Sequence, residues 1–250
     1  MSSGGRSLGA VARILVTGST QGLGRLTAEA LLADGHHVVA HGRDAGRLDD
    51  LAARGADVVT GDLADLEQTR GVAAQVNRLG RLDAVIHNAG VMTGPTVLPV
   101  NVVAPYLLTA LVTRPARLIY LSSGMHRGGR AELAGLDWSG TRPTASYSDS
   151  KLLLTTLAAA VARRWPEVHV HAVDPGWVPT RMGGAGAPGD LRLATPTQTW
   201  LATAEEPEAL TTDGYWYHRR RLDRHPMASD RDFQDRLLEA LAGHTGTPLA

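Results

Sequence analysis

Short apolar runs alternate along the chain with stretches in which apolar residues recur every three or four positions. The short runs have the length and the valine, isoleucine and leucine content of buried strands. The predicted strands cover residues 13–17, 37–41, 57–60, 84–87, 117–121 and 169–173. The longer stretches have the periodicity of amphipathic helices. The predicted helices cover residues 22–33, 45–53, 66–79, 102–112, 146–165 and 231–242.

This alternation predicts the fold class. Strands joined by crossover helices form parallel sheets that carry helices on both faces. We therefore expect an α/β fold, with one doubly wound, Rossmann-type parallel sheet that spans residues 11–243 as a single domain. Gly35, Gly55 and Gly80 each follow a predicted helix, where a left-handed residue is expected as the cap. Outside the domain, we expect a disordered N-terminus over residues 1–10 and a frayed tail over residues 244–250.

Composition excludes several function classes. The 250 residues are 43% hydrophobic and 20% charged, which is typical of a soluble globular protein with a large core. The net charge is zero, so nothing favours nucleic acid or an anionic membrane as a partner. The one basic cluster, Arg219-Arg220-Arg221, is expected in a solvated loop. No cysteine is present, which removes thiol chemistry and cysteine metal sites, and no metal site is expected. With no signal peptide or apolar span, a cytoplasmic location is expected.

Candidate chemistry begins with the only lysine. Lysine and arginine together number 25, and all but Lys151 are arginine. Lys151 follows Tyr147 by four residues, which places both side chains on one face of a helix. A phenol has an ordinary pKa of about 10, so it acts as an acid or base near neutral pH only when its surroundings change that value. An ammonium is a compact charge that an arginine fork does not replace. The pair is therefore a candidate acid–base unit.

A glycine-rich turn follows the first predicted strand. Gly18, Gly22 and Gly24 lie between that strand and a helix, an arrangement that lets the backbone approach a pyrophosphate at the helix N-terminus. At the end of the second strand stands Arg43, where NAD-binding proteins carry an acidic residue. Asp44 is explained as a helix N-cap. The sequence favours NADP(H) over NAD(H) as cofactor, and a surface Arg43 without a ligand remains the alternative.

These motifs, in this order, resemble the short-chain dehydrogenase/reductase family over about residues 11–220. Further motifs carry the resemblance: Gly61-Asp62-Leu63, Asn88-Ala89-Gly90, Asn101, Leu121-Ser122-Ser123 and Asp174-Pro175-Gly176-Trp177-Val178-Pro179-Thr180.

The resemblance implies a role for each site residue. Ser123 would bind the substrate carbonyl and Tyr147 would donate the proton, while Lys151 would lower the tyrosine pKa and hold the nicotinamide ribose. Asn101 would anchor a water that connects Lys151 to solvent. The implied catalytic residues are Asn101, Ser123, Tyr147 and Lys151. The implied cofactor-binding residues are Gly18, Ser19, Gln21, Gly22, Leu23, Gly24, Arg43, Asp62, Leu63, Asn88, Ala89, Gly90, Tyr147, Lys151, Pro175, Gly176, Val178 and Thr180.

The 23 residues between Ser123 and Tyr147 are similar to the retinol dehydrogenase-like and daunorubicin C-13 ketoreductase-like branch of the family. That likeness implies a small-molecule substrate, a bulky hydrophobic or polycyclic carbonyl compound reduced with NADPH. Trp138 and Trp177 are candidate pocket walls, with core packing as the alternative. His126 is a candidate substrate contact, but a place on a surface loop is the favoured expectation for it. Two other functions stay open. One is an NAD-dependent alcohol dehydrogenase that works oxidatively, and the other is a dinucleotide-sensing binding protein without catalysis.

The middle of the chain departs from the family pattern. Only ten residues separate Gly90 from Asn101, and the helix after Asn101 ends before Arg114-Pro115. Many relatives dimerise through this helix and the next, so a shortened surface leaves oligomeric state open. A monomer is slightly favoured over a dimer, because the apolar stripe within residues 230–243 can serve as a cover. Pro105 also lacks the N–H that would bond the Asn101 carbonyl, so that carbonyl is a candidate site for the water; ordinary tolerance of proline in the first turn of a helix is the equal alternative.

Overall fold

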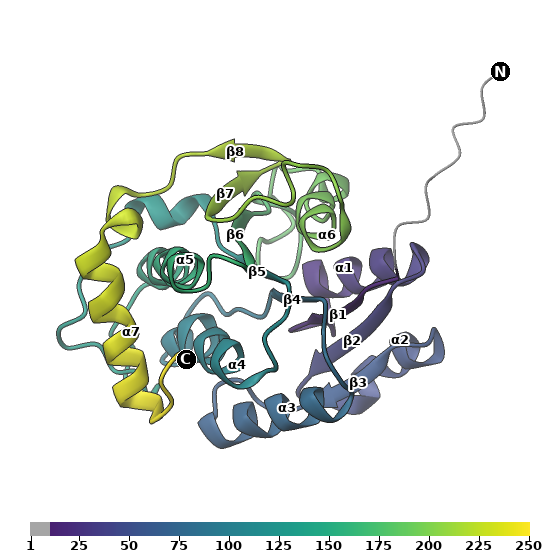
Figure 1. Cartoon of the computed structure of the whole chain (residues 1–250), viewed down its shortest axis with the longest axis horizontal. Helices are drawn as coiled ribbons and strands as arrows, with labels where there is room; N and C mark the ends of the chain where they lie inside the picture. Colours follow the sequence, from purple (N-terminus) through teal and green to yellow (C-terminus); the bar gives the residue numbers. More distant parts are fainter. Residues whose placement is uncertain (1–10) are drawn as a thin grey trace.

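The structure is a computed structural model that describes residues 11–250 (Figure 1). The expected disorder of residues 1–10 lies outside the described residues. Within them, one sheet has the strand order β3-β2-β1-β4-β5-β6-β7-β8, parallel except for the antiparallel pair β7 and β8. This order confirms the predicted doubly wound α/β fold. The strands are β1 Arg13–Val16, β2 His37–Gly42, β3 Asp57–Thr60, β4 Ala84–His87, β5 Arg117–Leu121, β6 His169–Asp174, β7 Gly214–Tyr217 and β8 Arg220–Leu222.

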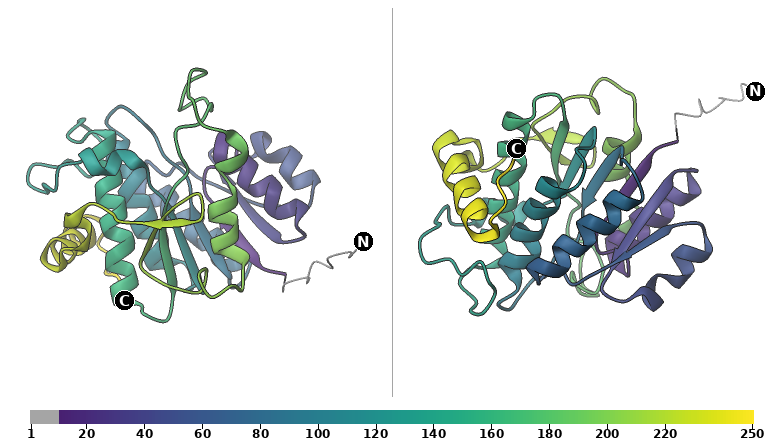
Figure 2. Two further views of the ribbon diagram at one scale, coloured as in Figure 1. Left: turned by 90° about the horizontal axis from the view of Figure 1, so that it is seen from above. Right: turned by 60° about the horizontal axis from the view of Figure 1, so that its bottom comes forward.

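Helices cover both faces of the sheet (Figure 2). They are α1 Gly22–Ala33, α2 Asp49–Ala53, α3 Leu66–Arg78, α4 Ala104–Leu111, α5 Tyr147–Arg164, α6 Pro196–Thr203 and α7 Arg231–Thr245. Short 3-10 turns are Ala45–Leu48, Gly124–Gly128, Leu191–Leu193 and Pro226–Ser229. Strand residues alternate between two cores. Leu15 packs with α3, α4, α5 and α7, whereas Ile14 and Val16 pack with α1, α2 and α6. Gly35, Gly55 and Gly80 have φ of +86°, +92° and +103°, which confirms them as left-handed caps.

Helix α6 and strands β7 and β8 were not predicted from the sequence, and the two strands correct one expectation. Arg219, Arg220 and Arg221 do not form a solvated loop. Arg219 lies in a tight turn, and the other two belong to the exposed edge strand β8. Both turn residues, His218 and Arg219, have positive φ, the conformation that suits the twist of a two-residue hairpin. The Asn-Gly pair that usually marks such a turn is absent, so the sequence did not predict a hairpin here.

The helix that carries Asn101 begins earlier than predicted. A π-helical turn, Pro99–Val103, leads directly into α4. In this turn the Ala104 N–H bonds the Pro99 carbonyl five residues back instead of four. Pro105 follows in the first turn of α4, where it donates no hydrogen bond. Such widened turns occur often at functional sites, and this one carries Asn101.

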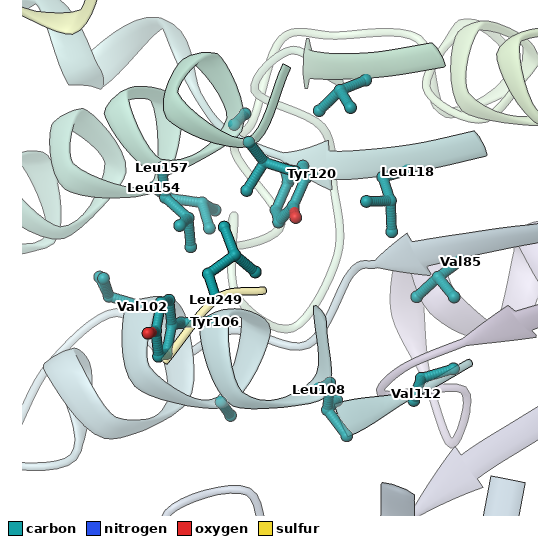
Figure 3. Packing of buried hydrophobic residues seen from close by; sticks show 14 of the residues in the cluster. Val85, Val102, Tyr106, Leu108, Val112, Leu118, Tyr120, Leu154, Leu157 and Leu249 are labelled. Carbon is teal, nitrogen blue, oxygen red and sulfur yellow. The ribbon is translucent and has the colours of Figure 1, made fainter. Parts of the chain in front are cut away.

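The C-terminal segment is packed, so the expected frayed tail over residues 244–250 is wrong. Helix α7 continues to Thr245, and Leu249 is only 8% exposed. Figure 3 shows Leu249 among buried side chains of α4 and α5. The Trp165 indole N–H donates to the Ala250 carbonyl at 2.5 Å. The tail stays in place because it closes the core beside two helices that would otherwise expose apolar surface.

Helix α7 itself is predicted to contribute strongly to stability. Phe233 is fully buried in the core shared with α5. Phe233→Ala should lower the free energy of unfolding by about 3–5 kcal/mol, because it removes a buried ring and leaves a cavity. Leu222→Ala, at a side chain that is 36% exposed, is the matched control and should change little. Urea unfolding of both variants measures the difference, and equal effects would mean that α7 is only loosely attached.

Candidate active site

The glycine turn after β1 forms the floor of a cleft of about 340 Å³. Gly18 and Gly22 have φ of +69° and +56°, which other residues rarely adopt. At Gly24 a Cβ would come within 2.2 Å of the Gly18 carbonyl oxygen, so no other residue fits that position. The cleft lies where the strand order reverses between β1 and β4, the place where such sheets bind nucleotides. This turn fits a pyrophosphate.

Most of the predicted cofactor residues line this cleft. They are Gly18, Gln21, Gly22, Leu23, Gly24, Arg43, Asp62, Leu63, Asn88, Ala89, Gly90 and Thr180. Ser19 and Val178 lie beside the cleft and are buried. The Ser19 hydroxyl donates to the Val16 carbonyl at 2.6 Å, so this side chain holds the turn in shape. Pro175 and Gly176 follow β6 and are partly buried. Among residues 11–250, no group of acidic, histidine or cysteine side chains is arranged to hold a metal ion.

His41 is a residue of the cleft that the sequence analysis did not assign. Its Nδ1 accepts the Gly18 N–H at 3.1 Å, and its Nε2 lies 3.0 Å from the Gly61 carbonyl oxygen. Burial lowers the pKa of His41, which favours the neutral ring that can accept at one nitrogen and donate at the other. His41 therefore ties the glycine turn to the end of β3. One sequence signal could have identified His41. It lies at the end of β2, where dinucleotide-binding proteins commonly carry an acidic residue.

Arginine borders the cleft on the side of β2, the strand that ends at Gly42. Arg43 is 73% exposed, and its guanidinium lies 3.8 Å from the Asp62 carboxylate. A second arginine, Arg47, donates to the Gln21 side chain at 3.1 Å across the glycine turn. Both guanidinium groups therefore stand at the rim of the nucleotide cleft.

The candidate catalytic hydroxyls, those of Ser123 and Tyr147, lie where β5 ends and α5 begins. Tyr147, the first residue of α5, lies near the side chain of Ser123. Ser122 points the other way, and its hydroxyl lies 2.7 Å from that of Thr155 inside the core. Of the two serines, Ser123 is therefore the one on the side of Tyr147. Ser146 and Asp149 form a capping box that fixes the first turn of α5.

Lys151 is 3% exposed, and its ammonium donates to the Leu121 carbonyl at 2.5 Å. The ammonium also lies 5.4 Å from the centre of the Tyr147 ring. Burial lowers the pKa of Lys151 to about 8, while the charge of Asp174 acts in the opposite direction.

The pKa of Tyr147 differs from the sequence-based expectation. Burial and the charge of Asp174 raise it to about 12, and the Ser123 side chain acts in the opposite direction. The pKa of Tyr147 is therefore raised. The expectation that Lys151 lowers it is wrong when only residues of the protein surround the phenol. The reason is that desolvation and a neighbouring carboxylate both favour the neutral phenol.

Asn101 is fully buried and braces the loop after β4. Its Oδ1 accepts the Val91 N–H at 2.8 Å, and its Nδ2 donates to the Val91 carbonyl and to the Ser150 hydroxyl at 2.9 Å each. A Cβ at Gly90 would lie 3.4 Å from Asn101 Oδ1 and 3.7 Å from Lys151 Nζ. Gly90 thus lies between Asn101 and Lys151. The side chain of Asn101 is therefore occupied in positioning the loop after β4.

The three candidate substrate residues lie in different surroundings. Trp138 packs against the core cluster and borders a separate pocket beside α3 and α7. Trp177 is 64% exposed, and its indole N–H donates to the Gly183 carbonyl. His126 is buried, so its expected place on a surface loop is wrong. The 3-10 turn after Ser123 directs its ring inward, where Nε2 accepts the His225 N–H at 3.1 Å.

A nucleotide cleft at the switch point of a doubly wound sheet, with a serine, a tyrosine and a lysine at its end, defines an NAD(P)-dependent oxidoreductase. The chain belongs to the short-chain dehydrogenase family. A family model described as short chain dehydrogenase matches residues 12–124.

Relatives extend this match over nearly the whole chain. Short-chain dehydrogenase chry4 of Gibberella zeae is 33% identical and covers 96% of this chain and 99% of its own. The putative daunorubicin C-13 ketoreductase DnrU of Streptomyces is 32% identical over 93% of this chain and 92% of its own. A crystal structure of a putative uncharacterized protein from Mycobacterium paratuberculosis superposes with a TM-score of 0.81, at 25% identity and 96% coverage of both chains.

Proposed function

We propose that this protein is an NADPH-dependent reductase that transfers hydride to the carbonyl of a bulky hydrophobic or polycyclic substrate. The observation that carries the proposal is the arrangement of Tyr147 and Lys151 on one face of α5 beside Ser123, with the buried ammonium 5.4 Å from the centre of the phenol ring. A phenol that keeps its proton at neutral pH is ready to act as an acid, as carbonyl reduction requires.

The protein groups have distinct roles in this reaction. When bound, the nicotinamide supplies the hydride. The hydroxyls of Ser123 and Tyr147 bind the carbonyl oxygen and polarise it. As the oxygen gains negative charge, the O–H bond of Tyr147 breaks and its proton passes to that oxygen. The ammonium of Lys151 then stabilises the tyrosinate until a proton from solvent restores the phenol.

The preference for NADPH is supported by the rim of the cleft. Arg43 is exposed and held only by a long contact with Asp62, so its guanidinium is available to a 2′-phosphate. Arg47, held over the glycine turn by Gln21, adds positive charge on the same side.

The substrate class is supported by apolar side chains around the catalytic end. Five of the large hydrophobic side chains that are exposed in the described structure belong to the loops that follow β4, β5 and β6. They are Met92, Met125, Trp177, Met182 and Leu193. Exposed apolar groups gathered near a site indicate an apolar ligand, and methionine adapts to irregular shapes. The relative named as a ketoreductase supports a carbonyl substrate.

The test is NADPH oxidation by the purified protein with aromatic, steroidal and polyketide ketones against small ketones. We expect turnover with the bulky compounds. Tyr147→Phe should lower kcat by about 10²–10⁴-fold, because the ring stays but the transferable proton is lost. Tyr106→Phe is the control, since its hydroxyl bonds Thr247 far from the cleft. Near-normal turnover by Tyr147→Phe would contradict the proposed mechanism.

Cofactor choice is tested separately by binding measurements. Arg43→Ala should weaken NADPH binding about 10- to 100-fold and leave NADH binding almost unchanged, because only NADPH loses a charge-assisted contact. Arg54→Ala removes an arginine that pairs with Glu29 outside the cleft, and it should alter neither affinity. Equal affinity of the parent protein for both nucleotides would favour the oxidative alternative.

We also propose that the chain is a monomer. Phe233, Leu237 and Leu241 of α7 are fully buried, and α7 packs along α5. The tail lies across α4, where the Tyr106 hydroxyl donates to the Thr247 carbonyl at 2.8 Å. Helix surfaces that relatives use to dimerise are therefore covered by the chain itself.

Light scattering over a dilution series should give the mass of one chain at every concentration. Removal of residues 230–250 should expose the faces of α4 and α5 and produce larger species or precipitation. A stable tetramer of the full chain would refute the monomer, and a soluble truncated monomer would show that the segment is no cover.

A further inference from the structure

Asp149 is a buried carboxylate in the first turn of α5 that takes no direct part in the proposed reaction. The residue is only 4% exposed. Its Oδ1 accepts the backbone N–H of Arg130 at 2.8 Å. Its Oδ2 accepts the Arg130 guanidinium at 3.0 Å and the backbone N–H of Ser146 at 2.9 Å. Three donors from two distant segments of the chain therefore converge on one carboxylate.

These two segments are the ones that carry the candidate catalytic hydroxyls. Ser146 directly precedes Tyr147 in the chain. The hydroxyl of Ser123 caps the 3-10 turn Gly124–Gly128, and Arg130 lies two residues beyond that turn. One carboxylate thus joins the segment of one hydroxyl to the segment of the other.

The loop after β5 and the helix are also in close contact beside this carboxylate. A Cβ at Gly129 would lie 2.5 Å from the Ser148 carbonyl oxygen and 2.8 Å from the Leu152 Cβ, so only glycine fits there. The backbone of the loop therefore rests directly on α5. This contact fixes how far the loop stands from the helix, while the directional bonds to Asp149 fix its position along the helix.

Asp149 remains charged at neutral pH. Burial raises its pKa, but the hydrogen bonds from Arg130 and Ser146 together outweigh this effect and hold the pKa at about 2. Hydrogen bonds to an ionised acceptor are shorter and stronger than those between neutral groups. A negative charge is also favourable at the N-terminus of a helix. The link between the loop and the helix is therefore firmer than a neutral side chain would make it.

We propose that Asp149 is a positioning residue that holds Ser123 and Tyr147 in the relative geometry needed to bind one carbonyl oxygen. The proposal rests on the proposed function, because it assumes that both hydroxyls act on the same oxygen. A displacement of about 1 Å in a reacting group can lower turnover about 100-fold. Asp149 acts through the two segments that it joins.

The first test is the kinetics of ketone reduction by the full-length protein. Asp149→Asn keeps the size of the side chain but leaves one acceptor oxygen, so it should lower kcat about 10- to 100-fold. The Kd for NADPH should stay unchanged, because the nucleotide cleft is lined by other residues. Asp149→Glu restores both oxygens at a position where a capping box accepts glutamate, and it should recover most of the lost turnover.

Asp230→Asn is the matched control for this test. Asp230 is the N-cap of α7, where its side chain accepts the Phe233 N–H at 2.7 Å. The same chemical change at this second helix N-terminus should leave kcat unchanged. Equal kcat values for the parent and Asp149→Asn, or an equal loss in the Asp230 variant, would overturn the proposal.

Hydrogen exchange measured by NMR tests the link without any activity. In Asp149→Asn only one oxygen remains as acceptor, so the N–H of Arg130 or of Ser146 should exchange at least about 10-fold faster than in the parent. The Phe233 N–H should exchange at its parent rate. Unchanged exchange at both Arg130 and Ser146 would overturn the proposal. If the parent protein reduces no ketone, the proposed function fails, while exchange still shows whether Asp149 joins the two segments.

Arg130→Gln provides a second variant if Asp149→Asn does not fold. The Arg130 side chain is 74% exposed, so its replacement leaves the core intact. This variant should lower kcat about 3- to 10-fold, because one of the three donors is lost. Arg163→Gln breaks the ion pair with Asp235 near the other end of α5 and should leave kcat unchanged. Equal rates for these two arginine variants would refute the positioning role.

Discussion

The buried ammonium of Lys151 is the constraint on which the rest of the site depends. A charge removed from water needs a partner, and the Leu121 carbonyl at the end of β5 provides one at 2.5 Å. This bond holds the start of α5 against the end of β5. It thereby brings Tyr147, one helical turn before the lysine, to Ser123, two residues after Leu121 on the chain. Sliding α5 by one residue would separate the hydroxyls and leave the ammonium unpaired.

The protonation state of Tyr147 depends on the groups that surround it. In a partly desolvated region, a charge acts over several ångströms with little screening. Burial and the carboxylate of Asp174 both favour the phenol. The proton of Tyr147 is therefore held by groups that lie far from it along the chain.

Apolar side chains are covered in one region of the molecule and exposed in another. Helices α4 and α5 are covered by α7 and the tail, and Leu249 is packed among their side chains (Figure 3). Around the catalytic end, by contrast, large side chains such as Met125 and Trp177 stay exposed. The chain thus buries one apolar surface with its own last residues and leaves another exposed.

Interactions over a few residues could be predicted from the sequence by itself. The alternation of strands and helices, the glycine turn and the Tyr147–Lys151 spacing determined the sheet, the cleft and the acid–base pair. Short segments without strong periodicity, namely α6, β7 and β8, could not be predicted in this way. The burial of His126, the clamp made by His41 and the raised pKa of Tyr147 were decided only by the tertiary structure. Each depends on groups remote along the chain, such as Asp174 for the phenol, because burial and electrostatic fields sum over neighbours in space.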